Sequence, residues 1–393
     1  MSKLNIGVIF GGNSTEHEVS VITGLQVLAN INKEKYQVIP IYVSKQGEWF
    51  SDECLSKAET FKDLDRIDRG VKRFAFSPTG PRPKLVKISE GLLGRKEELA
   101  VDVFFPCFHG GLGESGGFAG LFEVAGIPYI GSGILGSSLG MDKVLMRQVF
   151  TANNIPQTEY TWYYRHEWEQ KMEQYIPQIE AVLQYPLFVK PSNSGSSIGV
   201  ARAENRDELL NAVEVASVFD QKVMVEKAIV NAKEINISVL GNSGGELRTS
   251  VCERVVSDSD FLDYDQKYKS QRGKSQGMVS ARREIPAILD QGLRARLEET
   301  AKKVFNCLNC HGLARVDFLV KEETEEIFVI EINTIPGSMS FYLWEAGGLS
   351  FPNMIDELIN LALSRFDERR KTTTSFSSNI LSNFSPSLKA PKI

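Results

Sequence analysis

The sequence predicts an α/β fold, and two kinds of pattern carry this prediction. Residues 6–10 form a short apolar run that ends in Gly11-Gly12 and leads into a helical pattern, and residues 101–105 begin a second such unit. A strand, a glycine turn and a helix in succession are typical of doubly wound sheets. Residues 313–320 and 327–333 alternate apolar and polar side chains around a charged connector, which predicts an antiparallel hairpin. A chain of 393 residues with both patterns is expected to form two or three domains.

Composition argues against several classes of partner. The chain has 45 Lys and Arg against 50 Asp and Glu, a net charge of −5, and the charges are interspersed, so nucleic acid is not an expected partner. No apolar run approaches the roughly 18 residues that a membrane span needs, and the first residues read as a strand rather than a signal peptide. Five scattered cysteines do not make a disulfide framework. We therefore expect a cytoplasmic protein with no membrane partner.

The first strand and helix carry a candidate binding residue. Glu16 follows the glycine turn at the carboxyl end of the strand, where open α/β sheets bind ligands, although it could simply favour the helix dipole. The turn lacks GxGxxG, which disfavours a nicotinamide cofactor. Thr15 and Glu18 have capping-box spacing. The helix is expected to bury one apolar side, made of Val19, Ile22, Leu25 and Ala29.

The second unit follows a less regular stretch. Residues 50–98 mix charge, proline and glycine, which predicts irregular elements around one or two edge strands. Residues 101–105 then enter a glycine-rich loop that holds His109 and Glu114. A helix and a short strand at 127–130 complete another βαβ unit. A histidine among glycines is most often structural, but the position of His109 at the carboxyl end of a strand makes it a candidate.

A second domain is expected to begin near Lys143 and to contain a phosphate-binding loop. A strand ends at Lys190 and runs into a loop of small, hydroxyl-bearing residues. Backbone N–H groups and the hydroxyls of Ser194, Ser196 and Ser197 can close over phosphate oxygens, while Lys190 supplies positive charge. A plain hairpin turn is the alternative, which so many small residues in one connection disfavour.

Two further segments extend this site. Glu226 and Lys227 close an apolar strand, where polar groups could recognise the edge of an adenine, and Glu234 lies one short strand later. The polar segment FLDYDQKYKSQRGKSQG contains Lys267 and Tyr268. It lacks apolar periodicity, which predicts a mobile lid.

The hairpin is the strongest candidate for a metal site. If its strands fold symmetrically about Thr324, Asp317 lies opposite Glu331 and Arg315 lies opposite Asn333, all on one face. Two carboxylates and an amide oxygen are hard ligands that suit Mg²⁺ beside a nucleotide phosphate. A polar sheet face with Arg315 paired to Glu331 is the alternative. The opposite face is expected to present Val316, Phe318, Phe328, Ile330 and Ile332.

A set of motifs in one order resembles the D-alanine–D-alanine ligases, a family of the ATP-grasp superfamily. The motifs are GGNSTEHEVS, HGGLGESG, GSGILGSSLGMDK, VKPSNSGSSIGV, VEKAI, DYDQKY, ARVDF and EINTIPG, and the resemblance covers residues 4–362. It implies an ATP-grasp fold with an N-terminal Rossmann-like domain (1–140), a central ATP-grasp subdomain (141–235) and a C-terminal subdomain with the magnesium and substrate site (236–366). Residues 367–393 are Ser/Thr-rich and are expected to form a disordered tail.

The resemblance also implies an activity. One D-alanine carboxylate would attack the γ-phosphate of ATP, and the amine of a second D-alanine would attack the resulting D-alanyl phosphate, giving D-alanyl-D-alanine for peptidoglycan synthesis. Matching positions imply two Mg²⁺ ions, with Mn²⁺ as a substitute, held by Asp317, Glu331 and Asn333. The positions that match the ATP-binding residues of the family are Lys143, Lys190, Ser196, Ser197, Glu226, Lys227, Ile229, Glu234 and Lys267.

The amino-acid side of the site is implied in the same way. Glu16 would anchor the ammonium group of the first substrate and hydrogen-bond through Ser196 to Tyr268, which fastens the lid. His109 joins the substrate-binding set. Arg315 and the backbone amide of Gly337 would stabilise the oxyanion of the tetrahedral intermediate. Members of the family are commonly homodimers, which implies a homodimer here.

The chain departs from the family pattern at two positions. Tyr342 stands where the family has a serine that binds the carboxylate of the second substrate; its phenol could donate the same hydrogen bond or narrow the pocket. Ser115 replaces a common aspartate in the glycine-rich loop. Tyr268 is typical of dipeptide-forming members. A ligase with D-serine or D-lactate as acceptor is the first alternative, and an ATP-binding paralogue without ligase activity is the second.

Overall fold

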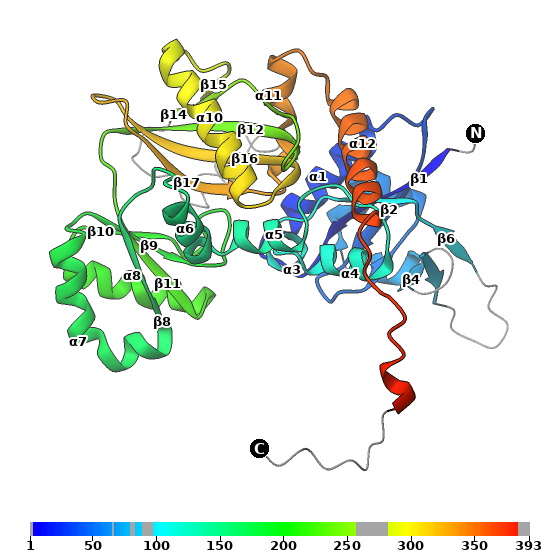
Figure 1. Cartoon of the computed structure of the whole chain (residues 1–393), viewed down its shortest axis with the longest axis horizontal. Helices are drawn as coiled ribbons and strands as arrows, with labels where there is room; N and C mark the ends of the chain where they lie inside the picture. Colours follow the sequence, from blue (N-terminus) through cyan, green and yellow to red (C-terminus); the bar gives the residue numbers. More distant parts are fainter. Residues whose placement is uncertain (1–2, 65–66, 79–82, 89–96, 257–281, 384–393) are drawn as a thin grey trace.

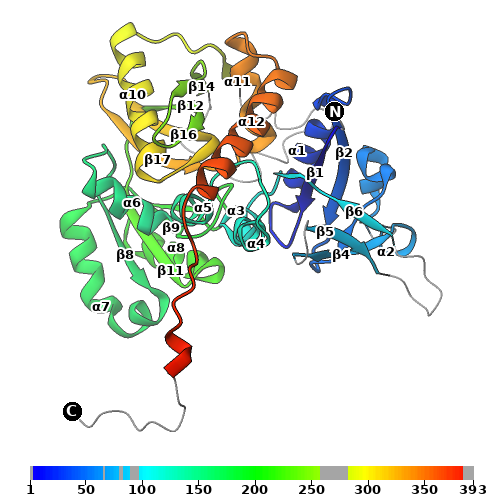
Figure 2. The same ribbon diagram turned by 45° about the vertical axis from the view of Figure 1, so that its right-hand side comes forward.

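The computed structural model describes residues 3–64, 67–78, 83–88, 97–256 and 282–383, which form three β-sheets with flanking helices (Figures 1 and 2). In the first sheet, β1 (Leu4–Gly11) lies between two parallel neighbours, β2 (Tyr36–Val43) and β7 (Val103–Pro106). The helix α1 (His17–Asn30) follows β1 directly. The predicted strand, glycine turn and helix are thus confirmed.

The same sheet continues to its edge with antiparallel strands. Its order is β6-β5-β4-β3-β2-β1-β7. We expected one or two edge strands in residues 50–98, and the structure has more. The observed strands are short and mostly half-buried, so their sequences show no clear alternation. The added elements are β3 (Trp49–Phe50), β4 (Arg73–Ser77), β5 (Lys84–Lys87), β6 (Glu98–Ala100), η1 (Glu53–Ser56), η2 (Ala58–Lys62) and α2 (Ile67–Gly70).

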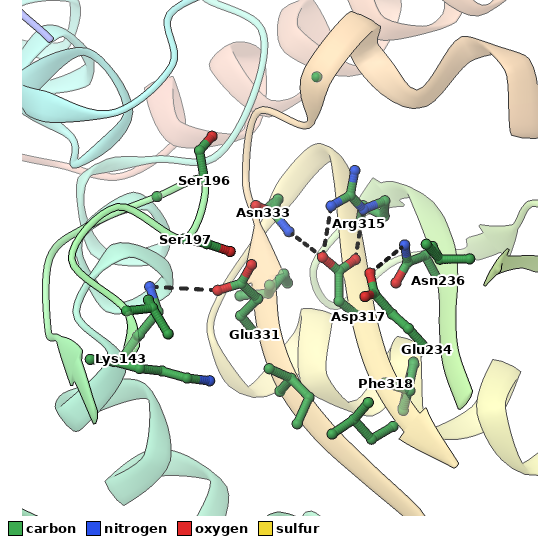
Figure 3. A pocket seen from close by; sticks show the side chains of 18 of the residues that line it. Lys143, Ser196, Ser197, Glu234, Asn236, Arg315, Asp317, Phe318, Glu331 and Asn333 are labelled. Carbon is green, nitrogen blue, oxygen red and sulfur yellow. Dashed lines mark hydrogen bonds and ion pairs between the residues drawn. The ribbon is translucent and has the colours of Figure 1, made fainter. Parts of the chain in front are cut away.

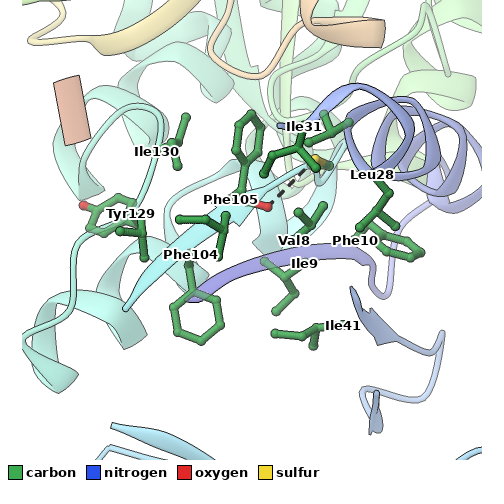
Figure 4. Close-up of a cluster of buried hydrophobic side chains, with 14 of the residues drawn as sticks. Val8, Ile9, Phe10, Leu28, Ile31, Ile41, Phe104, Phe105, Tyr129 and Ile130 are labelled. Atoms are coloured by element: carbon green, nitrogen blue, oxygen red, sulfur yellow. Dashed lines mark hydrogen bonds between the residues drawn. The ribbon is translucent and has the colours of Figure 1, made fainter. Parts of the chain in front are cut away.

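The core of the first sheet draws on both ends of the chain. Figure 4 shows part of its N-terminal contribution, including Val8, Leu28 and Phe104. Phe104 on β7 stacks on Phe122 of α4 (Gly117–Ala125), with ring centroids 4.3 Å apart. The same buried cluster includes Ile355 and Leu358 of the C-terminal helix α12 (Phe351–Arg370). The last long helix therefore completes the hydrophobic core of the first sheet.

The first helix differs from its prediction. Its N-cap is Glu16 without a side-chain cap bond, and Glu18 pairs with Lys45 instead of forming a capping box. Ile22 is exposed, as is Ala29, whereas the buried residues of α1 include Ser20 and Thr23. The buried side is partly polar because it faces the loops that build the site: the Ser20 hydroxyl donates to the carbonyl of Cys107 at 2.8 Å.

The middle sheet has the order β10-β9-β11-β8 and is antiparallel. Its strands are β8 (Tyr160–Tyr164), β9 (Leu187–Pro191), β10 (Ala201–Ala203) and β11 (Lys222–Lys227). The helices α7 (Arg165–Val182) and α8 (Arg206–Phe219) share one buried cluster with β9 and β11. The other face of this sheet is left for the site.

The third sheet contains the predicted hairpin. The strands are β12 (Ala232–Asn242), β13 (Leu247–Thr249), β14 (Glu253–Val256), β15 (Arg282–Glu284), β16 (His311–Lys321) and β17 (Ile327–Asn333), and α10 (Gln291–Cys307) packs on the buried face. The predicted register is confirmed: Arg315 pairs with Asn333 and Asp317 with Glu331.

A register shift after Asp317 changes the buried face of the hairpin. Phe318 pairs with Val329, so Ile330 is the additional residue of a β-bulge on β17. Val329 is therefore buried in the core, whereas Ile330 lines the pocket and Phe328 lies under the Lys321 ammonium. The expectation that Phe328 and Ile330 face the core was wrong, while Val316, Phe318 and Ile332 are buried as expected.

The remaining helices lie between the first and middle sheets or follow the last strand of the third. They are α3 (Gly111–Glu114), α5 (Ile134–Met141), α6 (Lys143–Ala152), η4 (Gly337–Ser340), α11 (Phe341–Ala346) and η5 (Ile380–Asn383). The helix α12 continues to Arg370, past the residue at which the tail was expected to begin, and residues 371–382 are exposed. Among the described residues, no helix is both long and apolar enough to cross a membrane.

Candidate active site

Polar side chains form a row across four neighbouring strands of the third sheet. Asp317 pairs with Glu331 on one side and with Asn236 on the other, and Asn236 pairs with Glu253. Directly paired residues project from the same face of a sheet, so the row places three carboxylates and an amide on one surface. Figure 3 shows the part of this row from Glu331 to Asn236.

Asp317 is the most constrained carboxylate in the row. Arg315 donates from Nε to Oδ1 at 2.6 Å and from Nη2 to Oδ2 at 2.7 Å, and Asn333 Nδ2 donates to Oδ2 at 2.9 Å (Figure 3). Burial raises the pKa of Asp317 to about 6; Arg315 opposes this shift, while Glu331 and Glu234 add to it. Arg315 pairs with Asp317, and Glu331 pairs with Lys143.

The donor set of the hairpin fits a hard divalent cation. Asp317, Glu331 and Asn333 offer oxygen ligands from adjacent strands. Burial is the main cause of the raised pKa of Asp317, and a bound cation would stabilise the charged form of this buried carboxylate. Within the described residues, no group of three His, Cys, Asp or Glu side chains could by itself hold a metal. Mg²⁺ commonly takes only one or two protein carboxylates and completes its shell with water and phosphate, so two carboxylates are sufficient.

Lys143 connects the middle of the chain to the hairpin. Its Nζ lies 3.5 Å from Glu331 Oε2 and donates to the carbonyl of Ser194 at 2.6 Å. Lys143 is the first residue of α6, and the preceding Asp142 caps this helix, accepts from Ser192 Oγ at 2.6 Å and pairs with Lys222. The cap fixes where the lysine emerges, so its ammonium group is held between the serine loop and Glu331.

Lys190 and Glu226 form a buried ion pair at the other end of the pocket. Arg147 also donates to Glu226, from Nη2 to Oε2 at 2.6 Å, as does Thr158 Oγ1 at 2.8 Å. Burial alone would raise the pKa of Glu226, but Lys190 and Arg147 hold it below its usual range. Glu226 is therefore an ionised, buried acceptor that already has three partners.

The serine loop contacts the first domain through Glu16. The Ser196 hydroxyl donates to Glu16 Oε1, and Glu16 is buried. Two glycines leave room for this carboxylate: a Cβ on Gly195 would lie 2.4 Å from Glu16 Oε2, and one on Gly110 would lie 2.7 Å from the same atom. A side chain at either position would displace the Glu16 carboxylate from its present place. Gly110 also has φ 64°.

His109 belongs to a polar network between α1 and the turn after β17. Thr23 Oγ1 and His109 Nε2 lie 2.8 Å apart, and the backbone N–H of Ser338 donates to Thr23 Oγ1 at 3.1 Å. Burial, assisted by nearby Arg315, lowers the pKa of His109 to about 4. Burial and the neighbouring Glu16 raise the pKa of Glu114 to about 8. Near neutral pH His109 is thus an uncharged group that positions the turn containing Gly337.

Tyr342 lies at the far end of the row. Its hydroxyl donates to Glu253 Oε1 at 3.3 Å, and Arg283 Cζ lies 5.1 Å from the centre of its ring. Burial and the Glu253 carboxylate raise the pKa of Tyr342 to about 12, so its hydroxyl stays protonated. Asn236 Nδ2 also donates to Glu253 Oε1, at 3.0 Å.

One pocket of about 520 Å³ collects nearly all the predicted residues. The Tyr342 hydroxyl donates to Glu253, which is part of the pocket lining. Lys267 and Tyr268 lie outside the described residues. Sequence reasoning missed Asn236, Glu253, Arg283 and Arg147; only the alternation of Glu234, Asn236 and Ser238 on one strand could have signalled the first. The predicted residues in the lining are Glu16, His109, Lys143, Lys190, Ser196, Ser197, Glu226, Lys227, Ile229, Glu234, Arg315, Asp317, Glu331, Asn333 and Gly337.

The architecture and the pocket define an ATP-grasp protein, in which two α/β units with antiparallel sheets enclose a site lined by lysines on one side and carboxylates on the other. Residues 5–132 match the family model for the D-ala D-ala ligase N-terminus, and residues 149–360 match the model for the D-ala D-ala ligase C-terminus. The chain therefore belongs to the D-alanine–D-alanine ligase family.

Individual relatives cover nearly the whole chain. A D-alanine–D-alanine ligase of Natranaerobius thermophilus is 38% identical over 382 residues, which are 96% of this chain and 100% of that protein. One of Clostridium acetobutylicum is 40% identical over 370 residues, 92% of this chain and 99% of that protein. The solved D-alanine–D-alanine ligase of Coxiella burnetii has a TM-score of 0.78 at 28% identity, covering 94% and 97% of the two chains. The VanG D-Ala:D-Ser ligase of Enterococcus faecalis has a TM-score of 0.77 at 33% identity, covering 92% and 100%.

Proposed function

We propose that this protein is a D-alanine–D-alanine ligase that uses ATP to join two D-alanine molecules through a D-alanyl phosphate intermediate, for the synthesis of peptidoglycan precursors. The observation that carries the proposal is the convergence of Asp317, Glu331 and Asn333 with Lys143 and Lys190 in one pocket. The family membership and the names of relatives at 38–40% identity support the same reaction.

The ATP end of the pocket is proposed to lie between the middle sheet and β12. Lys143 and Lys190 neutralise phosphate charge, and the hydroxyls of Ser196 and Ser197 donate to phosphate oxygens. Glu226, Lys227, Ile229 and Glu234 bind the adenosine. Because Lys190 pairs with Glu226 in this structure, its contact with phosphate requires the ammonium to leave Glu226, which then keeps Arg147 and Thr158 as partners.

The cation site is proposed to hold two Mg²⁺ ions, or Mn²⁺ in their place, on Asp317, Glu331 and Asn333. When bound, these ions neutralise charge on the phosphoryl group that is transferred. The protein's own contribution is positional: Arg315 and Asn333 fix the Asp317 carboxylate, and Lys143 fixes Glu331.

The amino-acid end of the pocket is proposed to lie between Glu16 and Arg315. Glu16 binds the ammonium group of the first D-alanine and is itself oriented by Ser196. His109 holds the turn that carries Gly337, and the Gly337 amide and the Arg315 guanidinium stabilise the oxyanion of the tetrahedral intermediate. Lys267 and Tyr268 are proposed to cover this end.

The test is release of phosphate from ATP with D-alanine as the only amino acid, followed by identification of the product. D-Alanyl-D-alanine formation supports the proposal, and no turnover on D-alanine alone overturns it. Turnover only after addition of D-serine or D-lactate would support the second candidate, a ligase with another acceptor, which Tyr342 at the serine position favours. ATP binding without any product would indicate a paralogue that has lost ligase activity.

Three organisational features are part of the proposal. The division into residues 1–140, 141–235 and 236–366 is supported by the three sheets, although β12 of the third sheet already begins at Ala232. The expected tail, 367–393, begins later in the structure, because α12 runs to Arg370. A homodimer is supported by exposed apolar side chains on the neighbouring helices α3, α4 and α5, namely Leu112, Val124, Ile134 and Leu135, and sedimentation tests it. Since the reaction consumes ATP, we place it in the cytoplasm.

A further inference from the structure

Arg283 lines the pocket with hydrogen-bonding capacity that the described residues do not use. Its Nε is buried and has no hydrogen-bond partner among those residues. It forms an ion pair with Glu253, with 3.6 Å between Nη1 and Oε2, which is too long for a hydrogen bond. A guanidinium that lines a pocket and has an unused buried Nε–H is suited to an anionic, planar group such as a carboxylate.

The Tyr342 hydroxyl cannot donate to a bound carboxylate while it donates to Glu253. A phenol has one proton to donate, and that of Tyr342 goes to Glu253 Oε1 at 3.3 Å. The ring also lies against the Arg283 guanidinium, with Cζ 5.1 Å from its centre. Tyr342 thus replaces the small serine of related ligases with a bulky group whose hydroxyl is turned to a protein carboxylate. Recognition of the acceptor then requires another donor.

Glu253 interacts with both the Tyr342 hydroxyl and the Arg283 guanidinium. It is only 1% exposed, and its Oε1 accepts from Asn236 at 3.0 Å as well as from Tyr342. Its Oε2 has no hydrogen-bond partner among the described residues and faces Arg283 at 3.6 Å. The carboxylate therefore attracts the guanidinium toward the tyrosine ring without occupying its N–H groups.

The position of Arg283 fits the acceptor rather than ATP. Arg315 and Arg283 both line the pocket, Arg283 Cζ lies 5.1 Å from the centre of the Tyr342 ring, and both guanidinium groups act electrostatically on the Tyr342 hydroxyl. The proposed function assigns Arg315 to the oxyanion that forms when the acceptor attacks. A small amino acid whose amine lies at that point extends its carboxylate a few ångströms further.

We propose that Arg283 binds the carboxylate of the acceptor, in the role that the serine hydroxyl plays in related ligases, with Glu253 and Tyr342 as its positioning residues. This inference rests on the proposed ligase function. It applies equally to D-alanine, D-serine and D-lactate, because all three carry the same carboxylate, beside an attacking amine in the two amino acids and an attacking hydroxyl in D-lactate.

The test varies the acceptor and the arginine together. D-Alanine is the donor, and D-alanine or D-alaninamide is the acceptor; the two products are separated by chromatography and mass. D-Alaninamide keeps the attacking amine of D-alanine but lacks its negatively charged carboxylate. We expect Arg283→Met to lower efficiency with the free acid about ten- to a hundredfold and to leave the amide almost unchanged, so that the preference for the acid collapses. The KM for ATP should not change.

Arg248→Met is the matched control, since Arg248 lies in the same sheet and pairs with Glu357 on the surface. It should retain the preference for the acid. Equal losses with both acceptors in Arg283→Met would show a structural role only and overturn the inference. If Arg283→Met does not fold, Arg283→Lys decides: the retained charge should still favour the acid, and loss of that preference overturns the inference. Wild-type protein that makes neither product overturns the ligase function itself.

Discussion

The Ser196 hydroxyl donates a hydrogen bond to Glu16, although the two residues lie 180 positions apart in the chain. This bond joins the serine loop of the middle sheet to the mouth of the first sheet. It is also the contact that Gly195 and Gly110 make room for. With Glu16 in its proposed role, the carboxylate that binds the first substrate would also hold the serine loop.

Glu16→Gln should weaken binding of the first D-alanine. The amide keeps the size of the side chain and removes the charge that attracts an ammonium group, so we expect the KM for D-alanine to rise about ten- to a hundredfold, with a smaller change in the KM for ATP. Steady-state kinetics measure both. Glu18→Gln is the control, because Glu18 lies on the same helix and pairs with Lys45 at the surface. Similar effects of the two substitutions would contradict the role of Glu16.

Asp317→Asn should lower turnover by orders of magnitude while the protein stays folded. The substitution removes one anionic ligand of the proposed cation site but preserves shape and leaves an oxygen for Arg315. Phosphate release and the thermal midpoint are the measurements. Glu325→Gln is the control on the same hairpin, since Glu325 pairs with Arg296 far from the row. Near-normal turnover in Asp317→Asn would refute the cation assignment.

His109 should make stability depend on pH. Its pKa is about 4 in the folded protein, because burial, with help from Arg315, disfavours the charged ring, and about 6.5 in the unfolded chain. Between these values the unfolded chain binds the extra proton, so the free energy of unfolding falls as pH falls, by about 2 kcal/mol at pH 5.

Urea unfolding at pH 7 and pH 5 measures this contribution. Between pH 7 and pH 5, wild-type protein should lose more stability than the His109→Gln variant, because the substituted side chain does not titrate. His166→Gln, at an exposed position, should behave as wild type. An identical loss in His109→Gln and wild type would show that the buried ring does not contribute.

Arg147→Met should destabilise the protein by about 3 kcal/mol. Arg147 is fully buried and donates to Glu226, so its removal leaves a buried carboxylate with less compensation. The double variant Arg147→Met/Glu226→Gln removes that charge as well. We expect it to lose less stability than the sum of the two single losses, as measured in a double-mutant cycle. Strict additivity would mean that the pair is not energetically coupled.

Gly24→Ala should destabilise the first core by about 1–3 kcal/mol. A Cβ at this position would lie 2.5 Å from the Phe10 ring, so helix and strand would have to separate. Gly120→Ala is the matched control in α4, where the nearest atom to the added Cβ is 3.8 Å away. It should be neutral or slightly stabilising. Denaturant midpoints compare the two, and equal effects would show that α1 packs loosely.

The sequence was informative for the hairpin, where the alternation of polar and apolar residues along each strand indicates which side chains share a face. The register of the hairpin followed from alternation alone, which is why Arg315, Asp317, Glu331 and Asn333 were placed together correctly. The bulge at Ile330 was not visible, because an unpaired residue depends on how β17 fits the neighbouring core.

Other features depended on contacts between distant segments. Glu253 and Arg283 reach the pocket only through the pairing of β14 with β12 and of β15 with β14, and no local pattern indicates either pairing. The partly polar side of α1 was missed for a similar reason. Thr23 is buried because His109 and the Ser338 amide satisfy its hydroxyl, and both partners lie far along the chain.

The docking of α12 into the first core has a consequence for synthesis of the protein on the ribosome. The strands that begin the chain form one cluster with Ile355 and Leu358, which are translated near its end. The N-terminal strands therefore keep an apolar surface exposed until almost the whole chain has been translated. A ribosome-bound chain truncated before residue 351 should consequently bind chaperones and be cut by proteases in its earliest strands, whereas the released chain should resist both.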